Sequence, residues 1–118
     1  MNKIIQLGNI CPTKTRVNPN QGRVYSPEGI SPTLNCCGGG NLQPFILEDR
    51  GGIDLKVRRY TPKECFRLMG FDDADVDLLK QNGISDTQLY KLAGNSIVVD
   101  VVECLFCQIF DSNNELWV

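Results

Sequence analysis

Residues 1–60 carry short apolar segments separated by Gly, Pro and Asn, and this pattern predicts strands joined by loops. The expected strands cover residues 4–7, 23–25, 44–47 and 55–58, the last of which alternates apolar and basic side chains. Clusters of turn-forming residues lie between them. We therefore expect a small irregular β region with long loops, where binding residues are often found.

After Tyr60 the pattern becomes helical. Thr61 and Glu64 form a capping box around Pro62, and Gly70 marks the end of this first helix. Because strands come first and helices follow, the predicted fold class is α+β.

Two more short helices are expected next. One covers residues 75–81, and the other begins at Ser85, where Gln88 completes a second capping box, and ends at Gly94.

The segment after residue 96 allows two interpretations. Its β-branched residues suit a strand, but the apolar positions 98, 101, 102, 105, 106 and 109 form a helical stripe, and the length of the run also favours a helix. We expect a helix whose N-terminus is capped by Asn95 and Ser96. No apolar run reaches the roughly 20 residues that a membrane span needs, so no membrane contact is expected.

Six cysteines could form disulfides, hold a metal or lie in the core as free thiols. Cys104 and Cys107 have a spacing found in zinc sites, and Cys36 with Cys37 would complete a set of four ligands. Because Cys104 and Cys107 fall in the apolar helical run and the chain has no His, we expect these two thiols in the core and no bound metal. A zinc-stapled structural domain is the alternative. No secretory signal is visible, which indicates a reducing cytoplasm.

The charge is unevenly distributed. Residues 1–70 hold ten Lys and Arg against five Asp and Glu, a balance of +5, whereas residues 71–118 hold two against nine, a balance of −7. The asymmetry suggests two surfaces with different partners, and ordinary surface charge is the alternative.

The usual signatures of an independent enzyme are missing. The sequence has no G-x-G-x-x-G, no Walker loop, no H-E-x-x-H and no His to serve as a general base. We therefore assign no catalytic residue.

Two segments resemble motifs of the DNA (cytosine-5) methyltransferases. Residues 59–71, Arg-Tyr-Thr-Pro-Lys-Glu-Cys-Phe-Arg-Leu-Met-Gly-Phe, resemble the ninth motif, and residues 88–99, Gln-Leu-Tyr-Lys-Leu-Ala-Gly-Asn-Ser-Ile-Val-Val, resemble the tenth. Upstream, residues 21–40 resemble the target-recognition region of bacterial restriction-modification enzymes of the HhaI type. The resemblance extends from about residue 4 to about residue 110.

The resemblance also shows what this sequence lacks. The family carries its cofactor glycines, its Pro-Cys nucleophile and its Glu-Asn-Val acid in earlier motifs, and none of these patterns occurs here. Cys11 and Pro12 stand in the reverse order. The chain is similar to the last third of such an enzyme, as a natural split subunit, a remnant or an expressed fragment, and we expect it to transfer no methyl group alone.

The resemblance implies three regions and several partners. Residues 1–60 would read DNA, residues 61–94 would form the motif-nine region, and residues 95–118 would form a helix that docks on a missing α/β catalytic domain. The partners would be double-stranded DNA, from which the family flips its target cytosine, and an N-terminal catalytic part. We also expect the last helix either to self-associate through residues 98–110 or to pack back on its own domain. The location would be the cytoplasm of a bacterium, with the gene bacterial or from a phage.

The candidate DNA-binding residues are Gln21, Arg23, Ser31, Thr33, Gly38, Gly39 and Gly40. Arg23 follows a Gly turn and would donate two hydrogen bonds to guanine, whereas Ser31 and Thr33 would bind phosphate. The glycines allow a close backbone approach. The alternatives are a solvated Arg, strand packing for Thr33 and a flexible loop at the glycines.

The candidate cofactor residues are Asn95, Ser96 and Ile97. The expected helix N-terminus at Asn95 offers free N–H groups, and the resemblance places these residues beside S-adenosylmethionine. A plain helix cap is the alternative. For the whole chain, the alternative to a methyltransferase portion is a free-standing DNA-binding or regulatory module.

Overall fold

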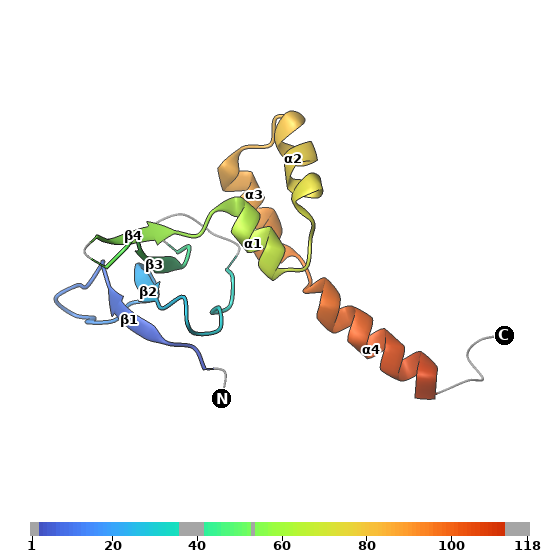
Figure 1. Ribbon diagram of the computed structural model, residues 1–118, viewed down its shortest axis with the longest axis horizontal. Coiled ribbons are helices and arrows are strands. Elements are labelled where there is room, and N and C mark those ends of the chain that lie inside the picture. Colours follow the sequence, from blue (N-terminus) through green and yellow to red (C-terminus); the bar gives the residue numbers. More distant parts are fainter. Residues whose placement is uncertain (1–2, 36–41, 53, 113–118) are drawn as a thin grey trace.

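The computed structural model describes residues 3–35, 42–52 and 54–112. Among these residues, a β region occupies the first half of the chain and four helices the second, which confirms the α+β class (Figure 1). The elements are β1 (Gln6–Asn9), β2 (Arg23–Tyr25), β3 (Phe45–Asp49), β4 (Leu55–Arg59), α1 (Pro62–Leu68), α2 (Asp73–Gln81), α3 (Asp86–Asn95) and α4 (Val99–Ser112).

The four strands form one mixed sheet in the order β1-β2-β3-β4. β1 pairs antiparallel with β2, β2 pairs parallel with β3, and β3 pairs antiparallel with β4. β1 begins at Gln6 and not at residue 4 as the sequence predicted, because its partner β2 ends at Tyr25, the residue opposite Gln6. β3 likewise lies further along the chain than predicted and ends at Asp49.

The two predicted capping boxes are confirmed. Thr61 Oγ1 accepts a hydrogen bond from the Glu64 amide at 3.2 Å, and the Thr61 amide donates to the Glu64 carboxylate at 2.8 Å. Ser85 and Gln88 make the same reciprocal arrangement at the start of α3. After α1, Gly70 has a φ of 86°, a conformation that favours glycine.

Two predicted helix limits are wrong. α2 begins at Asp73, two residues earlier than expected, because Asp72 already has the extended conformation of an N-cap residue. α3 continues through Gly94 to Asn95, and Ser96 is its C-cap. The Ser96 hydroxyl donates to the Ala93 carbonyl at 2.8 Å and satisfies one acceptor at the helix end.

The main apolar core lies among α1, α2 and α3 and is joined to the sheet by Tyr60. Its buried members are Tyr60, Cys65, Phe66, Val76, Leu89 and Ala93. Tyr60 directly follows β4, its amide donates to the Pro44 carbonyl at 3.0 Å, and its own carbonyl accepts from the Tyr90 hydroxyl at 2.6 Å. These contacts fix the sheet region relative to the helices.

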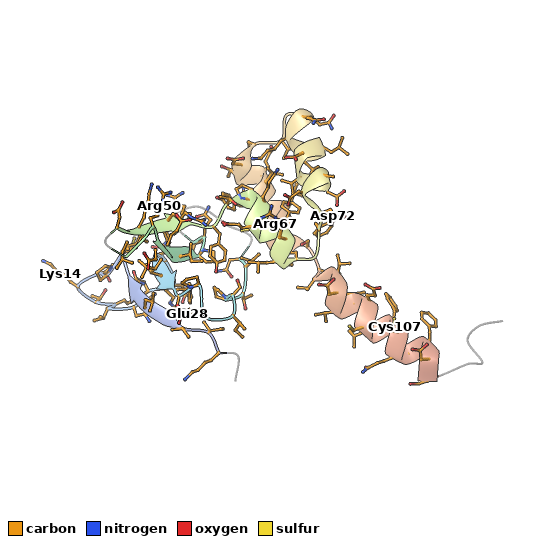
Figure 2. The ribbon with its side chains drawn as sticks, in the orientation of Figure 1. Lys14, Glu28, Arg50, Arg67, Asp72 and Cys107 are labelled. Carbon is orange, nitrogen blue, oxygen red and sulfur yellow. The ribbon has the colours of Figure 1, made fainter. Side chains whose placement is uncertain are left out.

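α4 extends away from the other three helices (Figure 1). It is helical, as the stripe predicted, but none of its described residues is buried. Cys104 and Cys107 are exposed free thiols, so the prediction that they lie in the core was wrong. Figure 2 shows Cys107 on α4, away from the other helices. The reason is that no other described element covers α4. Its first amide, that of Val99, donates to the Met69 carbonyl at 3.0 Å and anchors its start.

Taken together, residues 86–112 have the length and mean hydropathy of a membrane-crossing helix, which is a longer apolar stretch than the sequence pattern predicted. Residues 96–98 interrupt this stretch, and Leu89 and Ala93 before the interruption are buried in the core. α4 alone has 14 residues, about 21 Å of helix against a hydrocarbon layer of about 30 Å. The absence of membrane contact stays a prediction.

Candidate functional site

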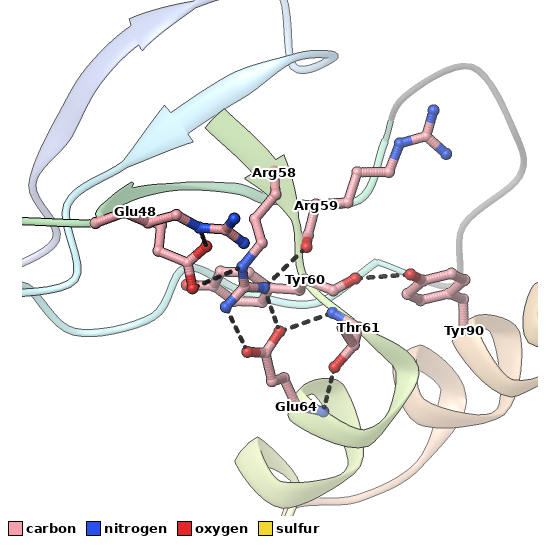
Figure 3. Close-up of polar contacts among 8 residues, drawn as sticks. Glu48, Arg58, Arg59, Tyr60, Thr61, Glu64 and Tyr90 are labelled. Carbon is pink, nitrogen blue, oxygen red and sulfur yellow. Dashed lines mark hydrogen bonds and ion pairs between the residues drawn. The ribbon is translucent and has the colours of Figure 1, made fainter. Parts of the chain in front are cut away.

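A charged cluster joins the sheet to α1. Arg58 on β4 donates two hydrogen bonds to the Glu64 carboxylate, at 2.9 and 2.8 Å, and its Nε lies 3.4 Å from Glu48 on β3 (Figure 3). Hydrogen bonds from Arg58 hold the pKa of Glu64 at about 2, well below its usual value. Glu64 therefore caps α1, as predicted, and binds Arg58, which in turn contacts β3.

Arg67 on α1 binds α2. Its Nε donates to Asp73 at 2.7 Å, and this hydrogen bond lowers the pKa of the Asp73 carboxyl. Lys63 and Asp77 make a second ion pair at 2.7 Å between the same two helices. These side chains have a structural role and lie outside the cavities described next.

A polar cavity of about 380 Å³ lies beside β2 and brings two predicted DNA-binding residues together. Arg23 and Thr33 both line it, although they come from a strand and from a loop that follows it. Gln6, Tyr25 and Gln43 contribute further polar groups. The Gln43 Oε1 atom is buried there without a hydrogen bond to the described residues. The cavity thus offers both donors and an acceptor to a polar ligand.

Arg23 is held more firmly than a solvated arginine would be. Its Nε donates to the Pro19 carbonyl at 3.2 Å and its Nη2 donates to the Asn18 carbonyl at 3.4 Å. A guanidinium has five N–H donors, so donors remain for a ligand in the cavity. The sequence pointed to Arg23 but missed the residues that hold the Asn18–Pro19 segment, because single Asn and Gln residues carry no periodic signal.

A second cavity of about 400 Å³ is shared between the loop after β2 and the α3–α4 junction. Ser31 and Thr33 line it on one side, and Ser96 and Val98 line it on the other. The Ser31 hydroxyl donates to the Pro32 carbonyl at 3.1 Å and also bonds the Tyr60 side chain, whose pKa burial raises. Ser31 is therefore more constrained than the exposed Thr33. Candidates for DNA binding and for cofactor binding meet at this cavity.

A groove of about 880 Å³ runs along α4, and Asn95, Ser96 and Ile97 all line it. Its remaining walls are mostly apolar and include Phe71 and Phe106. The predicted physical basis for these three residues was nevertheless wrong. Asn95 is the last residue of α3, and α4 begins at Val99, so Asn95 and Ser96 lie at a helix C-terminus with partial negative charge.

The remaining predicted DNA-binding residues are Gln21 and the three glycines at positions 38–40. The Gln21 side chain is exposed, and its main-chain carbonyl accepts a hydrogen bond from Asn9 at 2.9 Å. The glycines at positions 38–40 lie outside the described residues. Within the described part of the chain, no three His, Cys, Asp or Glu side chains gather in a way that would hold a metal ion.

The fold and its cavities define an α+β chain with a loop-lined polar cavity and an uncovered apolar helix. The profile of C-5 cytosine-specific DNA methylases matches residues 7–111. The chain belongs to this family.

Several relatives share its sequence over part of their own length. The orphan methyltransferase M.SPBetaI of Bacillus phage SPbeta is 36% identical over 129 aligned residues, which cover 74% of this chain and 29% of the relative. The type II methyltransferase M.HhaI of Haemophilus parahaemolyticus is 36% identical, covering 78% of this chain and 26% of the relative. The type II methyltransferase M.BanI of Aneurinibacillus aneurinilyticus is 33% identical, covering 97% and 26%. The chain thus spans well under a third of these relatives.

Proposed function

We propose that this chain is the DNA-recognition portion of an S-adenosylmethionine-dependent DNA (cytosine-5) methyltransferase that acts in DNA methylation and restriction-modification. Family membership supports the reaction class, and relatives are named as orphan and type II methyltransferases. The observation that carries the recognition role is the polar cavity beside β2, where Arg23 and Thr33 lie together.

Each side chain at this cavity would have a distinct role. Arg23 would present its remaining N–H donors to the O6 and N7 acceptors of a guanine in the major groove. The exposed Thr33 hydroxyl would bind a phosphate oxygen, which positions the duplex without reading its sequence. Ser31 would support this loop through its bond to Tyr60 more than it would contact DNA.

The residues at the start of the α4 groove fit one side of the cofactor. Asn95 offers an amide, Ser96 a hydroxyl, and Phe71 an aromatic surface beside them. When bound, S-adenosylmethionine would supply the methyl group, and these residues would contact it from one side. The exposed apolar side chains of α4 would pack on a separate catalytic part that supplies the other walls. The bacterial cytoplasm is the location that we propose.

DNA binding by the isolated chain is the direct test of the recognition role. Fluorescence anisotropy on duplex DNA should show salt-sensitive binding at about 10⁻⁴–10⁻⁶ M, and selection from a random duplex pool should enrich a sequence. Arg23→Ala should reduce the preference for that sequence more than the general affinity. The control is Arg16→Ala, which removes the same charge from an exposed loop residue and should weaken binding to all sequences alike.

Equal loss on every duplex after Arg23→Ala would show that Arg23 touches phosphate only. If the wild-type chain enriches no sequence, the recognition role fails.

A methyl-transfer assay tests whether the chain needs a separate catalytic part. The pure chain with DNA and labelled S-adenosylmethionine should give background counts, and co-expression with a candidate N-terminal catalytic part should restore methylation. Turnover by the chain alone would refute the portion hypothesis. Persistent DNA binding with no activity in any co-expression would favour a free-standing DNA-binding module.

A further inference from the structure

We propose that Asn9 is a positioning residue for DNA reading: its side-chain amide fixes the loop before β2 and, through that loop, orients Arg23. The inference rests on the proposed recognition function and adds a residue that does not line the polar cavity itself.

Asn9 is placed directly against the recognition segment. It is the last residue of β1 and is the register partner of Arg23 on β2. Its Oδ1 accepts from the Cys11 amide at 2.7 Å, and its Nδ2 donates to the carbonyls of Pro19 and Gln21 at 2.9 Å each. One carboxamide thus ties the end of β1 to both sides of the turn that leads into β2.

One of these loop carbonyls also holds Arg23. The Pro19 carbonyl accepts from Asn9 and from the Arg23 Nε, and the adjacent Asn18 carbonyl accepts from the Arg23 Nη2. If Asn9 releases the loop, the guanidinium loses the fixed acceptors that set its direction. Arg23 would keep its charge and its place on β2 but would no longer hold one orientation towards the cavity.

The packing at Gly22 makes this arrangement tight. Gly22 has a φ of 71°, and a Cβ at this position would lie 2.9 Å from the Cys11 Sγ. The turn before β2 therefore packs directly against Cys11. The Cys11 main-chain amide in turn donates to Asn9. The side-chain amides of Gln6 and Asn18 also bind each other next to this turn: the Gln6 Nε2 donates to the Asn18 Oδ1 at 2.7 Å.

The hydrogen bonds at position 9 need a side chain that both accepts and donates, as an amide does. The main-chain amide of Cys11 needs an acceptor, and the carbonyls of Pro19 and Gln21 need donors. Asparagine supplies both. Aspartate would face the two carbonyls with acceptor oxygens only, and alanine would leave all three groups without this partner.

The test compares Asn9→Ala with the wild-type chain on two duplexes, the sequence enriched from the random pool and the same sequence with one recognised guanine changed. Asn9→Ala should reduce the ratio of the two affinities about tenfold, because a bidentate base contact depends on orientation. Binding to unrelated duplex should change less than twofold, since the charge of the chain is unchanged. The control is Asn82→Ala, which also removes an amide hydrogen bond, to the Leu78 carbonyl, but lies in the helical region.

A double-mutant cycle separates positioning from general destabilisation. If Asn9 acts through Arg23, then Asn9→Ala should cause no further loss of discrimination in the Arg23→Ala chain. Additive losses would overturn the proposal. Should Asn9→Ala not fold, Asn18→Ala changes an exposed member of the same cluster and should lower the ratio about threefold.

The outcomes also separate this inference from the function on which it rests. If the wild-type chain selects a sequence and Asn9→Ala discriminates equally well, Asn9 has no positioning role and the recognition function stands. If the wild-type chain selects no sequence, both are refuted.

Discussion

Glu64→Gln is the sharpest test of how the sheet is joined to the helices. The carboxylate accepts two hydrogen bonds from Arg58 and one from the Thr61 amide, and its pKa is about 2 against an ordinary value of 4.5. The difference between these pKa values corresponds to at most about 3.4 kcal/mol. Because the Glu64 side chain is 33% exposed, solvent screening reduces the expected loss to roughly 1–2 kcal/mol at neutral pH.

The pH dependence distinguishes the ion pair from simple loss of the cap. The pKa of Glu64 is lower in the folded chain, so its stabilisation is complete above about pH 4.5 and is lost as the pH falls towards about 2. The difference in the free energy of unfolding between wild type and Glu64→Gln should therefore shrink over this range.

Urea denaturation followed by circular dichroism measures this difference. Glu28→Gln removes the same charge from an exposed loop residue and should change stability by less than about 0.5 kcal/mol. A gap between wild type and Glu64→Gln that is equal at neutral and acid pH would refute the assignment of the stabilisation to the Arg58–Glu64 pair.

Three further predictions concern the region from Gly70 to the end of α4. Gly70→Ala should lower the free energy of unfolding by about 1–2 kcal/mol in thermal denaturation, because φ is 86° and the new methyl group would lie 3.2 Å from the Val99 Cβ. Phe106→Glu should reduce self-association in sedimentation velocity, whereas Gln108→Glu should reduce it less because position 108 lies outside the predicted apolar stripe; equal association by all three chains would contradict a role for that stripe. Calorimetry at millimolar S-adenosylmethionine should detect no binding, because the groove beside Asn95 encloses a ligand from one side, and a micromolar affinity would show a complete pocket.

The local parts of the fold were predictable from sequence. The capping boxes at Thr61 and Ser85 were recognised because each joins residues three positions apart, so no distant contact is needed to define them. The helical character of α4 followed from the spacing of its apolar residues. Strand limits were less predictable, because the start of β1 depends on where its antiparallel partner β2 stops.

The positions of the candidate cofactor residues depended on tertiary structure. Asn95 and Ser96 were expected at the start of a helix, but α3 continues to Asn95 because glycine at position 94 is tolerated within a helix and Ser96 supplies the C-cap. The stripe of α4 could not reveal whether another layer covers it. Cys104 therefore looked like a core residue by sequence and is exposed in the structure.

The sequence by itself identified Arg23 and Thr33 as candidate DNA-binding residues, because both lie in a segment that resembles a target-recognition region. Only the tertiary structure showed that they share a cavity and that the loop carbonyls beside Asn9 hold the Arg23 guanidinium. The physical reason is that the Pro19 carbonyl accepts from the Asn9 amide, ten positions before it, and from the Arg23 guanidinium, four positions after it. Chain folding brings such groups together, and neither periodicity nor local propensity records them.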